Sequence, residues 1–252
     1  MPEPLLAVEL LSRNFGGLAA VREVSLALDQ GALHAVIGPN GAGKTTLLNL
    51  LSGDLRPSSG RVRFEGREIA GLPPERIARL GIARSYQKTN IFGGFTVFEN
   101  CRLAAQAALA PGLRCFRPAQ AYGAVNAAAA RALAEVGLEE RREDVAATLS
   151  HGEQRQLEIA MTLATAPKVL LLDEPLSGMG VEESVRMTAL IAGLEASHAI
   201  LLVEHDMDAV FSLARQLTVM VNGRVLESGT PEAIRRSPAV QEAYLGTLED
   251  AP

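Results

Sequence analysis

Three short stretches of the chain carry residue types that together could act on phosphate groups. The first, residues 38–45, follows the pattern G-x-x-x-x-G-K-[ST] without a mismatch. Glycines at these positions allow backbone N–H groups to turn inward around phosphates. Lys44 can reach the outer phosphates of a nucleotide, and the Thr45 hydroxyl can ligate Mg²⁺. The pattern therefore predicts a phosphate-binding loop.

The second stretch places two acids directly after an apolar run. Residues 169–172 read Val-Leu-Leu-Leu, and Asp173 and Glu174 follow them. Asp173 at a strand end can hold Mg²⁺ through water, and Glu174 can orient and deprotonate an attacking water molecule. Two acids after a buried strand would be unremarkable alone, so this interpretation depends on the phosphate-binding loop.

The third stretch, residues 149–154, reads Leu-Ser-His-Gly-Glu-Gln and leads into a helical segment. Ser150 and Glu153 form an S-x-x-E capping box, which is a sufficient structural reason for both residues. A capped helix start beside a glycine is also a site for anions. The sequence leaves both interpretations open, because they describe the same geometry.

The elements around these stretches predict an α/β protein with a mainly parallel sheet. An apolar run at 33–37 precedes the loop and helical spacing follows it, so the positive end of a helix dipole would face the anion. Later strands alternate with helices, as in sheets that helices cover on both faces. We expect a first core segment (1–95), an inserted helical subdomain (96–148), a second core segment (149–229) and a helical tail (230–252).

Composition and charge narrow the classes of function. The net charge of −5, without a basic stripe, argues against nucleic acid as a partner. No stretch approaches the ~18 uninterrupted apolar residues of a membrane-spanning helix. We expect no export signal at the N-terminus. Cys101 and Cys115 lack the spacing of metal ligands, so we expect both to be reduced and structural.

Taken together, the motifs resemble those of the ATP-binding subunits of ABC transporters over nearly the whole chain. Their order carries the resemblance: Phe15, 38–45, Gln87, 149–154, 169–174, 177–180 and His205. The resemblance implies the α/β P-loop NTPase fold of an ABC ATPase, with a parallel-sheet core, an N-terminal antiparallel β subdomain and an inserted α-helical subdomain. It also implies ATP and Mg²⁺ as ligands, and ATP hydrolysis coupled to transport across a membrane.

The resemblance further implies a role for each motif residue. Phe15 would stack on adenine, and Thr46 would contact the α-phosphate. Ser150 and Gly152 would contact the γ-phosphate of ATP held by a second subunit. The implied catalytic residues are Glu174, His205 and Gln87. The implied Mg²⁺ ligands are Thr45, Gln87 and Asp173. The implied nucleotide-binding residues are Phe15, Gly38, Pro39, Asn40, Gly41, Ala42, Gly43, Lys44, Thr45, Thr46, Ser150 and Gly152.

Two motifs depart from the usual family pattern. The signature is usually Leu-Ser-Gly-Gly-Gln, and here His151 and Glu153 replace its first glycine and its glutamine. This change concerns fine geometry and rate more than identity, since Ser150 and Gly152 are kept. The segment 177–180 ends in Gly180 where the family usually has Asp, which could weaken communication between subunits.

Several stretches resemble the subfamily that energises uptake of branched-chain amino acids, urea and other amides. These stretches are 81–87, 157–160, 175–179, 203–207 and 243–246. The implied partners are a second ABC ATPase subunit, integral membrane permease subunits and, indirectly, a periplasmic or extracellular solute-binding protein, with no nucleic acid. The implied location is the cytoplasmic face of the inner membrane, as a peripheral subunit.

Other classes remain as alternatives at this point. An ABC ATPase for export, for example of lipopolysaccharide, shares much of the same pattern. A soluble ABC protein that acts on ribosomes or DNA would usually carry a tandem cassette, a coiled-coil insertion or a basic arm. A P-loop GTPase or kinase is disfavoured, because the chain has no Asn-Lys-x-Asp motif. An inactive scaffold is disfavoured by the intact Lys44, Asp173, Glu174 and His205.

Overall fold

A six-stranded sheet forms the centre of this computed structural model, which describes residues 3–87, 90–109, 118 and 121–249. The strand order is β10-β9-β3-β8-β7-β6. All strands run parallel except β10, which pairs antiparallel with β9. Every residue of β3, β7 and β8 is buried, as expected for strands that helices cover on both faces. The bounds are β3 Leu33–Ile37, β6 Ile82–Arg84, β7 Val169–Asp173, β8 Ala199–Val203, β9 Gln216–Val221 and β10 Arg224–Gly229.

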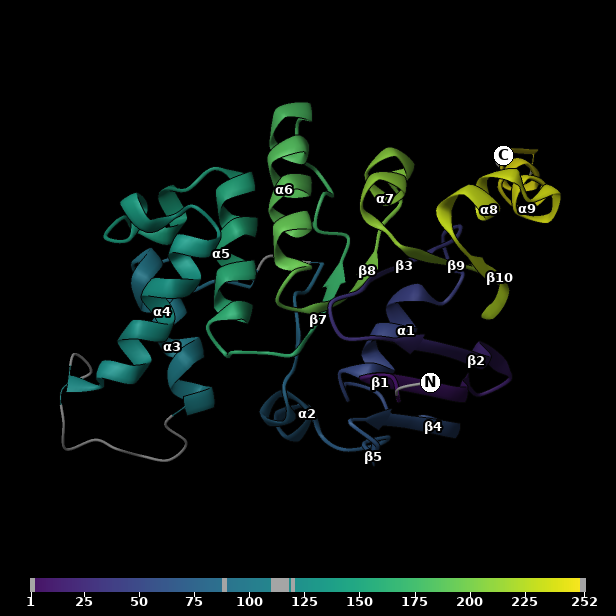
Figure 1. Ribbon diagram of the computed structural model, residues 1–252, viewed down its shortest axis with the longest axis horizontal. Coiled ribbons are helices and arrows are strands. Elements are labelled where there is room, and N and C mark those ends of the chain that lie inside the picture. The colour runs from purple at the N-terminus through teal and green to yellow at the C-terminus, as the bar shows by residue number, and fades with distance from the viewer. Residues whose placement is uncertain (1–2, 88–89, 110–117, 119–120, 250–252) are drawn as a thin grey trace.

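A smaller antiparallel sheet lies beside the central sheet (Figure 1). Its order is β2-β1-β4-β5, and its side chains share a core with those of α1, the helix that follows the phosphate-binding loop. The bounds are β1 Leu6–Phe15, β2 Leu18–Leu28, β4 Ser59–Phe64, β5 Arg67–Glu68 and α1 Lys44–Leu51. The predicted fold class, with a parallel core and an N-terminal antiparallel sheet, is therefore present in the structure.

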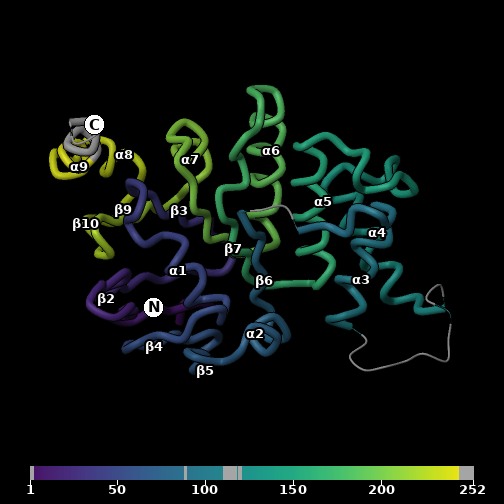
Figure 2. Tube along the Cα trace, turned by 180° about the vertical axis from the view of Figure 1, so that it is seen from behind, coloured from purple at the N-terminus to yellow at the C-terminus, as the bar shows by residue number. Residues whose placement is uncertain are grey.

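Two groups of helices lie at opposite ends of the molecule, and α6 and α7 lie between these groups (Figure 1). Figures 1 and 2 show α3, α4 and α5 gathered at one end of the molecule, and α8 and α9 at the other. Within the described residues, no helix is long and apolar enough to cross a bilayer. The bounds are α2 Pro74–Leu80, α3 Val97–Leu109, α4 Gly123–Glu135, α5 His151–Leu163, α6 Val181–Leu194, α7 Met207–Leu213, α8 Pro231–Arg236 and α9 Pro238–Glu249, with short 3₁₀ turns at Glu139–Arg141 and Ala146–Thr148.

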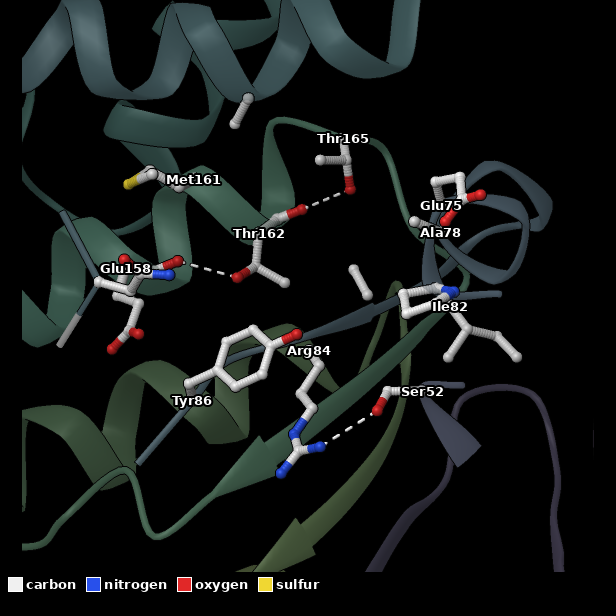
Figure 3. Close-up of a pocket in the computed structure, with 14 residues that line it drawn as sticks. Ser52, Glu75, Ala78, Ile82, Arg84, Tyr86, Glu158, Met161, Thr162 and Thr165 are labelled. Carbon is white, nitrogen blue, oxygen red and sulfur yellow. Dashed lines mark hydrogen bonds between the residues drawn. The ribbon is translucent and has the colours of Figure 1, made fainter. Parts of the chain in front are cut away.

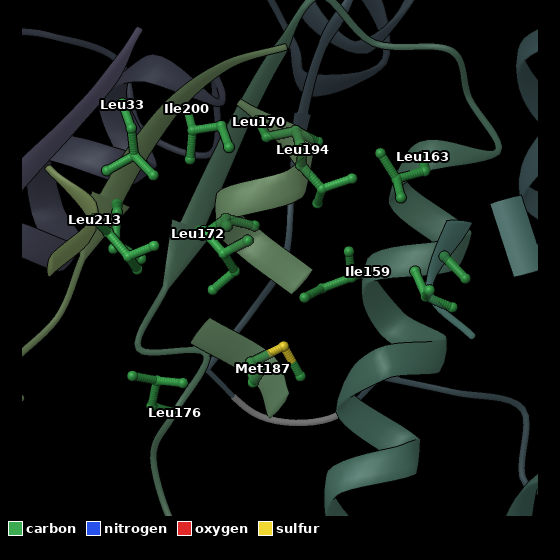
Figure 4. Packing of buried hydrophobic residues seen from close by; sticks show 14 of the residues in the cluster. Leu33, Ile159, Leu163, Leu170, Leu172, Leu176, Met187, Leu194, Ile200 and Leu213 are labelled. Atoms are coloured by element: carbon green, nitrogen blue, oxygen red, sulfur yellow. The ribbon is translucent and has the colours of Figure 1, made fainter. Parts of the chain in front are cut away.

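Helix α5 connects the end of the molecule that contains α3 and α4 to the central sheet (Figure 1). Its apolar face packs in the same buried cluster as α3, α4 and α6 (Figure 4). Ile159 and Leu163 of α5 lie across from Met187 and Leu194 of α6. Helix α5 packs against α3 and α4 and also against α6 and the central strands. The domain boundary between residues 148 and 149 stays a prediction.

The cysteines agree with a structural role as far as they are described. Cys101 is fully buried on α3, and burial raises the pKa of its thiol to about 12. A thiol with so high a pKa is not ionised near neutral pH and is therefore unreactive. Cys115 lies outside the described residues.

Candidate active site

The phosphate-binding loop connects the end of β3 to the start of α1. Gly43 is the N-cap of α1, with φ +98° and no side-chain cap, so the first N–H groups of the helix lack the usual capping oxygen. A Cβ on Gly43 would lie 2.3 Å from the carbonyl oxygen of Ala20. A Cβ on Gly38 would lie 2.1 Å from the oxygen of Met220. Only glycine fits at these two positions, as the motif predicts.

Neighbouring strands hold this loop in place. The N–H of Gly223, in the turn between β9 and β10, donates to the oxygen of Ala42 at 3.0 Å. The N–H of Arg22 on β2 then donates to the oxygen of Gly223 at 2.7 Å. The loop therefore has a fixed shape that depends on the β9–β10 turn and on β2.

Lys44 points back into the loop. Its Nζ donates to the carbonyl oxygens of Gly38 at 2.6 Å and Pro39 at 3.1 Å. Burial lowers the pKa of Lys44 below its ordinary value, while the nearby charges of Glu174 and Asp173 act in the opposite direction. The structure thus brings together the lysine and the acid pair, which lie about 130 residues apart in the chain.

Asp173 ends β7 and is almost completely buried, with 1% of its surface exposed. Its Oδ2 accepts a hydrogen bond from Nη2 of Arg84 at 2.8 Å. Its Oδ1 is buried and has no hydrogen-bond partner among the described residues. Burial raises the pKa of this carboxyl, and Arg84 opposes that shift. One oxygen of Asp173 is therefore fixed, and the other is left over for a further ligand.

Glu174 and Gln87 contact each other directly. Nε2 of Gln87 donates to Oε2 of Glu174 at 2.9 Å. The backbone of Glu174 has φ +49°, and its N–H donates to the oxygen of Val203 on the neighbouring strand at 2.8 Å. A positive φ in a glutamate is uncommon and costs energy, so the surrounding contacts must maintain it. The carboxylate is consequently directed away from the line of the strand, toward Gln87.

His205 follows β8, the strand next to β7. Asp173 pairs with Val203 across these strands, so the segments after both residues leave the same sheet edge. The side chain of His205 is 62% exposed, and its Nδ1 lies 3.5 Å from Oε2 of Glu204. His205 thus lies at the same sheet edge as Asp173, with its side chain exposed.

Ser150 and Gly152 lie elsewhere. The capping box is present: the N–H of Glu153 donates to the Ser150 hydroxyl at 3.3 Å, and the N–H of Ser150 donates to Oε2 of Glu153 at 2.8 Å. Helix α6 stands between this helix start and α1 (Figure 1). Within the described part of the chain, Lys44 donates to Gly38 and Pro39, whereas the Ser150 hydroxyl lies 3.5 Å from Oε1 of Glu183 on α6. These two residues therefore lie apart from Lys44, Asp173, Glu174 and Gln87 of the same chain.

Comparison with known proteins assigns the family. The family model described as ABC transporter matches residues 21–177, more than half of the chain. The chain is 42% identical to the high-affinity branched-chain amino acid transport ATP-binding protein LivG of Salmonella typhimurium, over 98% of this chain and 99% of LivG. The chain belongs to the ABC transporter family. Its predicted identity as an ATP-binding subunit with ATPase activity is confirmed.

Further ABC proteins are similar over their whole length. The chain is 42% identical to the ATP-binding protein BraF of Pseudomonas aeruginosa, over 98% of this chain and 99% of BraF. A solved ABC cassette in its ADP conformation has a TM-score of 0.86 and 28% identity, covering 97% of this chain and 100% of the other. A nucleotide-free ABC cassette has a TM-score of 0.85. The predicted ABC ATPase fold is confirmed.

Phe15 is the least constrained of the predicted residues of this ABC ATPase. It ends β1 and is 43% exposed. The guanidinium carbon of Arg13 lies 4.7 Å from the centre of its ring. One face of the ring is thus covered by a cation. Stacking of Phe15 on a base stays a prediction.

Arg84, which lies beside Asp173, is not among the predicted site residues of this ABC ATPase. Its guanidinium contacts Asp173 on one side and Asn49, Ser52 and Asp54 on the other. Figure 3 shows Arg84 and Tyr86 at the wall of a groove of about 390 Å³ between β6, α2 and α5. The sequence contained a signal for this contact, because Arg84 ends the short apolar strand β6 and a buried arginine must find hydrogen-bond acceptors.

Arg155 was missed as well, although it lies in the helix that begins at the signature. Its Nη1 donates to the oxygen of Tyr86 at 2.7 Å, and its Nη2 donates to the oxygen of Gln87. Its charge is paired with Glu158 at 2.9 Å, and both side chains are buried. Helix α5 of this ABC ATPase therefore holds the backbone of Gln87 directly.

Proposed function

We propose that this ABC ATPase energises the import of branched-chain amino acids. The relatives LivG and BraF are named as high-affinity branched-chain amino acid transport ATP-binding proteins, at 42% identity over nearly the full chain. A second family model, described as a branched-chain amino acid ATP-binding cassette transporter, matches residues 224–250. The C-terminal segment therefore supports this subfamily independently of the ATP-binding motifs.

The loop 38–46 binds the phosphates of ATP in this proposal. The uncapped N–H groups at the start of α1 and the inward-turned backbone face the anion. Lys44 gives up one of its two carbonyl contacts for the outer phosphates. Phe15 contacts the base, and Thr46 contacts the α-phosphate.

Thr45, Gln87 and Asp173 hold Mg²⁺ with the nucleotide. These residues fit a hard cation, since all offer oxygen atoms and Oδ1 of Asp173 is buried without a partner among the described residues. The ion neutralises charge on the phosphate oxygens when it is bound. Thr45 is exposed in the first turn of α1, so its hydroxyl is accessible to the same ligand.

Glu174 is the general base in this mechanism. The carboxylate accepts a proton from the attacking water, while the amide of Gln87 fixes the orientation of its Oε2. His205 contacts the γ-phosphate from the end of β8. The observation that carries the proposal is this convergence of Lys44, Asp173, Glu174 and Gln87 on one sheet edge.

Ser150 and Gly152 act on ATP held by a second subunit. They belong to the start of α5, which α6 separates from α1 (Figure 1), so one chain alone would leave its nucleotide half enclosed. Two subunits arranged head-to-tail would place each capped helix start against the nucleotide of the other. Closure of this dimer on ATP would then drive membrane permease subunits at the cytoplasmic face of the membrane, with a solute-binding protein delivering the substrate from the other side.

Two substitutions test the ATPase part of the proposal. Glu174→Gln should retain ATP binding and lower turnover by about 10²- to 10⁴-fold, the usual contribution of a general base. Lys44→Ala should lose ATP binding, as measured by isothermal titration, whereas Lys168→Ala, at an exposed pair with Glu65, is the matched control. Normal turnover in the first variant or normal binding in the second would contradict the assigned roles.

The transport part needs the whole complex. We expect the chain to co-purify with a permease pair, and ATP to drive uptake of leucine, isoleucine or valine into vesicles that contain the binding protein. ATP-dependent movement of these amino acids only in the opposite direction, or none with a loaded binding protein, would contradict import and leave the ATPase assignment intact.

A further inference from the structure

Arg84 links two parts of the site that the sequence keeps apart. Its Nη2 donates to Oδ2 of Asp173 at 2.8 Å. Its Nη1 lies within hydrogen-bond distance of Asn49 Oδ1 at 2.5 Å, Ser52 Oγ at 3.1 Å and Asp54 Oδ2 at 3.2 Å. These three acceptors lie at the C-terminal end of α1 or just after it. One planar side chain therefore ties the end of the phosphate-loop helix to the acid at the end of β7.

The contact between Arg84 and Asp173 uses only part of what each group offers. An arginine and a carboxylate commonly form two parallel hydrogen bonds. Here Nε of Arg84 and Oδ1 of Asp173 are both buried and without a hydrogen-bond partner among the described residues. A pair that served stability alone would gain from joining these atoms. The observed geometry instead fixes Oδ2 and leaves Oδ1 free.

We propose that Arg84 is a positioning residue that orients Asp173, so that Oδ1 faces the magnesium ion bound with the nucleotide. This inference rests on the proposed function, because that function makes Asp173 a ligand of the magnesium ion, and Arg84 would orient this ligand. The far side of Arg84 is anchored on α1, the helix that also carries Thr45. Arg84 thereby ties Asp173 to the helix that carries Thr45, the two oxygen-bearing residues that would hold the ion.

Lysine cannot replace this arginine. An ammonium group is a single point that offers no flat fork, so it cannot hold Asp173 and the α1 acceptors at a fixed angle. Arg84→Lys keeps the positive charge and loses the geometry, which separates positioning from simple charge compensation. The matched control is Arg63→Lys, since Arg63 pairs with Glu9 at 3.0 Å and both side chains are more than one-third exposed.

The experiment measures nucleotide binding and metal dependence separately. A non-hydrolysable ATP analogue is titrated into each protein by calorimetry, once in EDTA and once in Mg²⁺, and the Mg²⁺ concentration for half-maximal ATPase is determined. For Arg84→Lys we expect metal-free affinity within about twofold of the native value and a rise of about tenfold in the Mg²⁺ requirement, as for other residues that orient metal ligands. Arg63→Lys should change neither quantity.

Each outcome decides the question. An unchanged Mg²⁺ requirement in Arg84→Lys, or an equal loss of affinity with and without Mg²⁺, overturns the positioning role. If Arg84→Lys does not fold, Asp54→Asn takes its place, because it loosens the far side of Arg84 and leaves Asp173 intact. That variant should raise the Mg²⁺ requirement, and no rise overturns the proposal. Failure of the native protein to bind the analogue in either buffer would contradict the proposed function instead.

Discussion

Glu204 offers the sharpest test of how this site is held together. Its carboxylate is fully buried between the segment that contains Leu176 and the segment that contains His205. Oε1 accepts the N–H of Leu176 at 2.8 Å, and Oε2 accepts the N–H of His205 at 2.9 Å and that of Asp206 at 3.4 Å. One side chain thus holds the segment after Glu174 and the segment of His205 in a fixed relation.

Glu204→Ala would leave these donors without their acceptor. An unsatisfied buried donor costs about 1–3 kcal/mol. The N–H of Leu176 bears the full cost because Leu176 is buried, whereas the exposed surroundings of His205 and Asp206 let water replace part of the loss. We therefore expect a loss of about 3 kcal/mol in the free energy of unfolding. For a chain of this length, that corresponds to a fall of about 6–12 °C in Tm.

Thermal unfolding and ATPase kinetics measure the two consequences. Glu204→Gln is the matched control, because its amide keeps one acceptor oxygen at the same place and size, and it should fall between the native protein and Glu204→Ala. In Glu204→Ala we expect kcat to decrease and KM for ATP to stay nearly constant, since the contacts of Lys44 are not altered. A Tm within about 2 °C of the native value, together with an unchanged kcat, would refute this reasoning.

Two further predictions concern the loop and the sheet. Gly43→Ala should abolish ATP binding, since the added Cβ would lie 2.3 Å from the carbonyl oxygen of Ala20. In Gly41→Ala the added Cβ would meet no atom within 4 Å. Its backbone strain should therefore lower the free energy of unfolding by only about 1 kcal/mol, as measured in a denaturant titration. Burial lowers the pKa of His34 in the folded protein. As the pH falls, the unfolded chain therefore binds a proton at His34 at a higher pH than the folded protein does. Stability from neutral His34 is therefore present above about pH 6.5 and declines as pH falls, and His34→Gln should remove this component from pH-dependent urea melts.

The parts of the site that could be predicted are those whose geometry is local. Although contacts from the β9–β10 turn and β2 help to hold the loop 38–45, its pattern of glycines and Lys44 lies within eight residues and could be recognised in the sequence. The capping box of Ser150 spans four residues and was predicted for the same reason. The convergence of Lys44 with Asp173 agrees with a general rule, that the carboxyl ends of parallel strands meet at one edge of a sheet.

The parts that could not be predicted depend on contacts between distant segments. Arg84 and Asp173 are 89 residues apart, and Leu176 and Glu204 are 28 residues apart. Nothing in the local pattern says which acceptor a buried charge will find, because the register of neighbouring strands and the packing of α1 decide it. Gln87 was assigned from the resemblance, and its contact with Glu174 became visible only in three dimensions.

Three buried charged side chains, those of Arg84, Arg155 and Glu204, share one arrangement, which suggests what they contribute to the site. Arg84 holds a carboxylate, Arg155 holds the backbone of Gln87, and Glu204 holds the backbone of His205. Burying a charge is expensive, and a well-packed apolar side chain would often be as stable. An apolar side chain, however, cannot fix the direction of a carbonyl or a carboxylate. Gln87 and His205 are exposed, so their positions have to be set from the buried side, where a charged hydrogen bond is the strongest directional contact available.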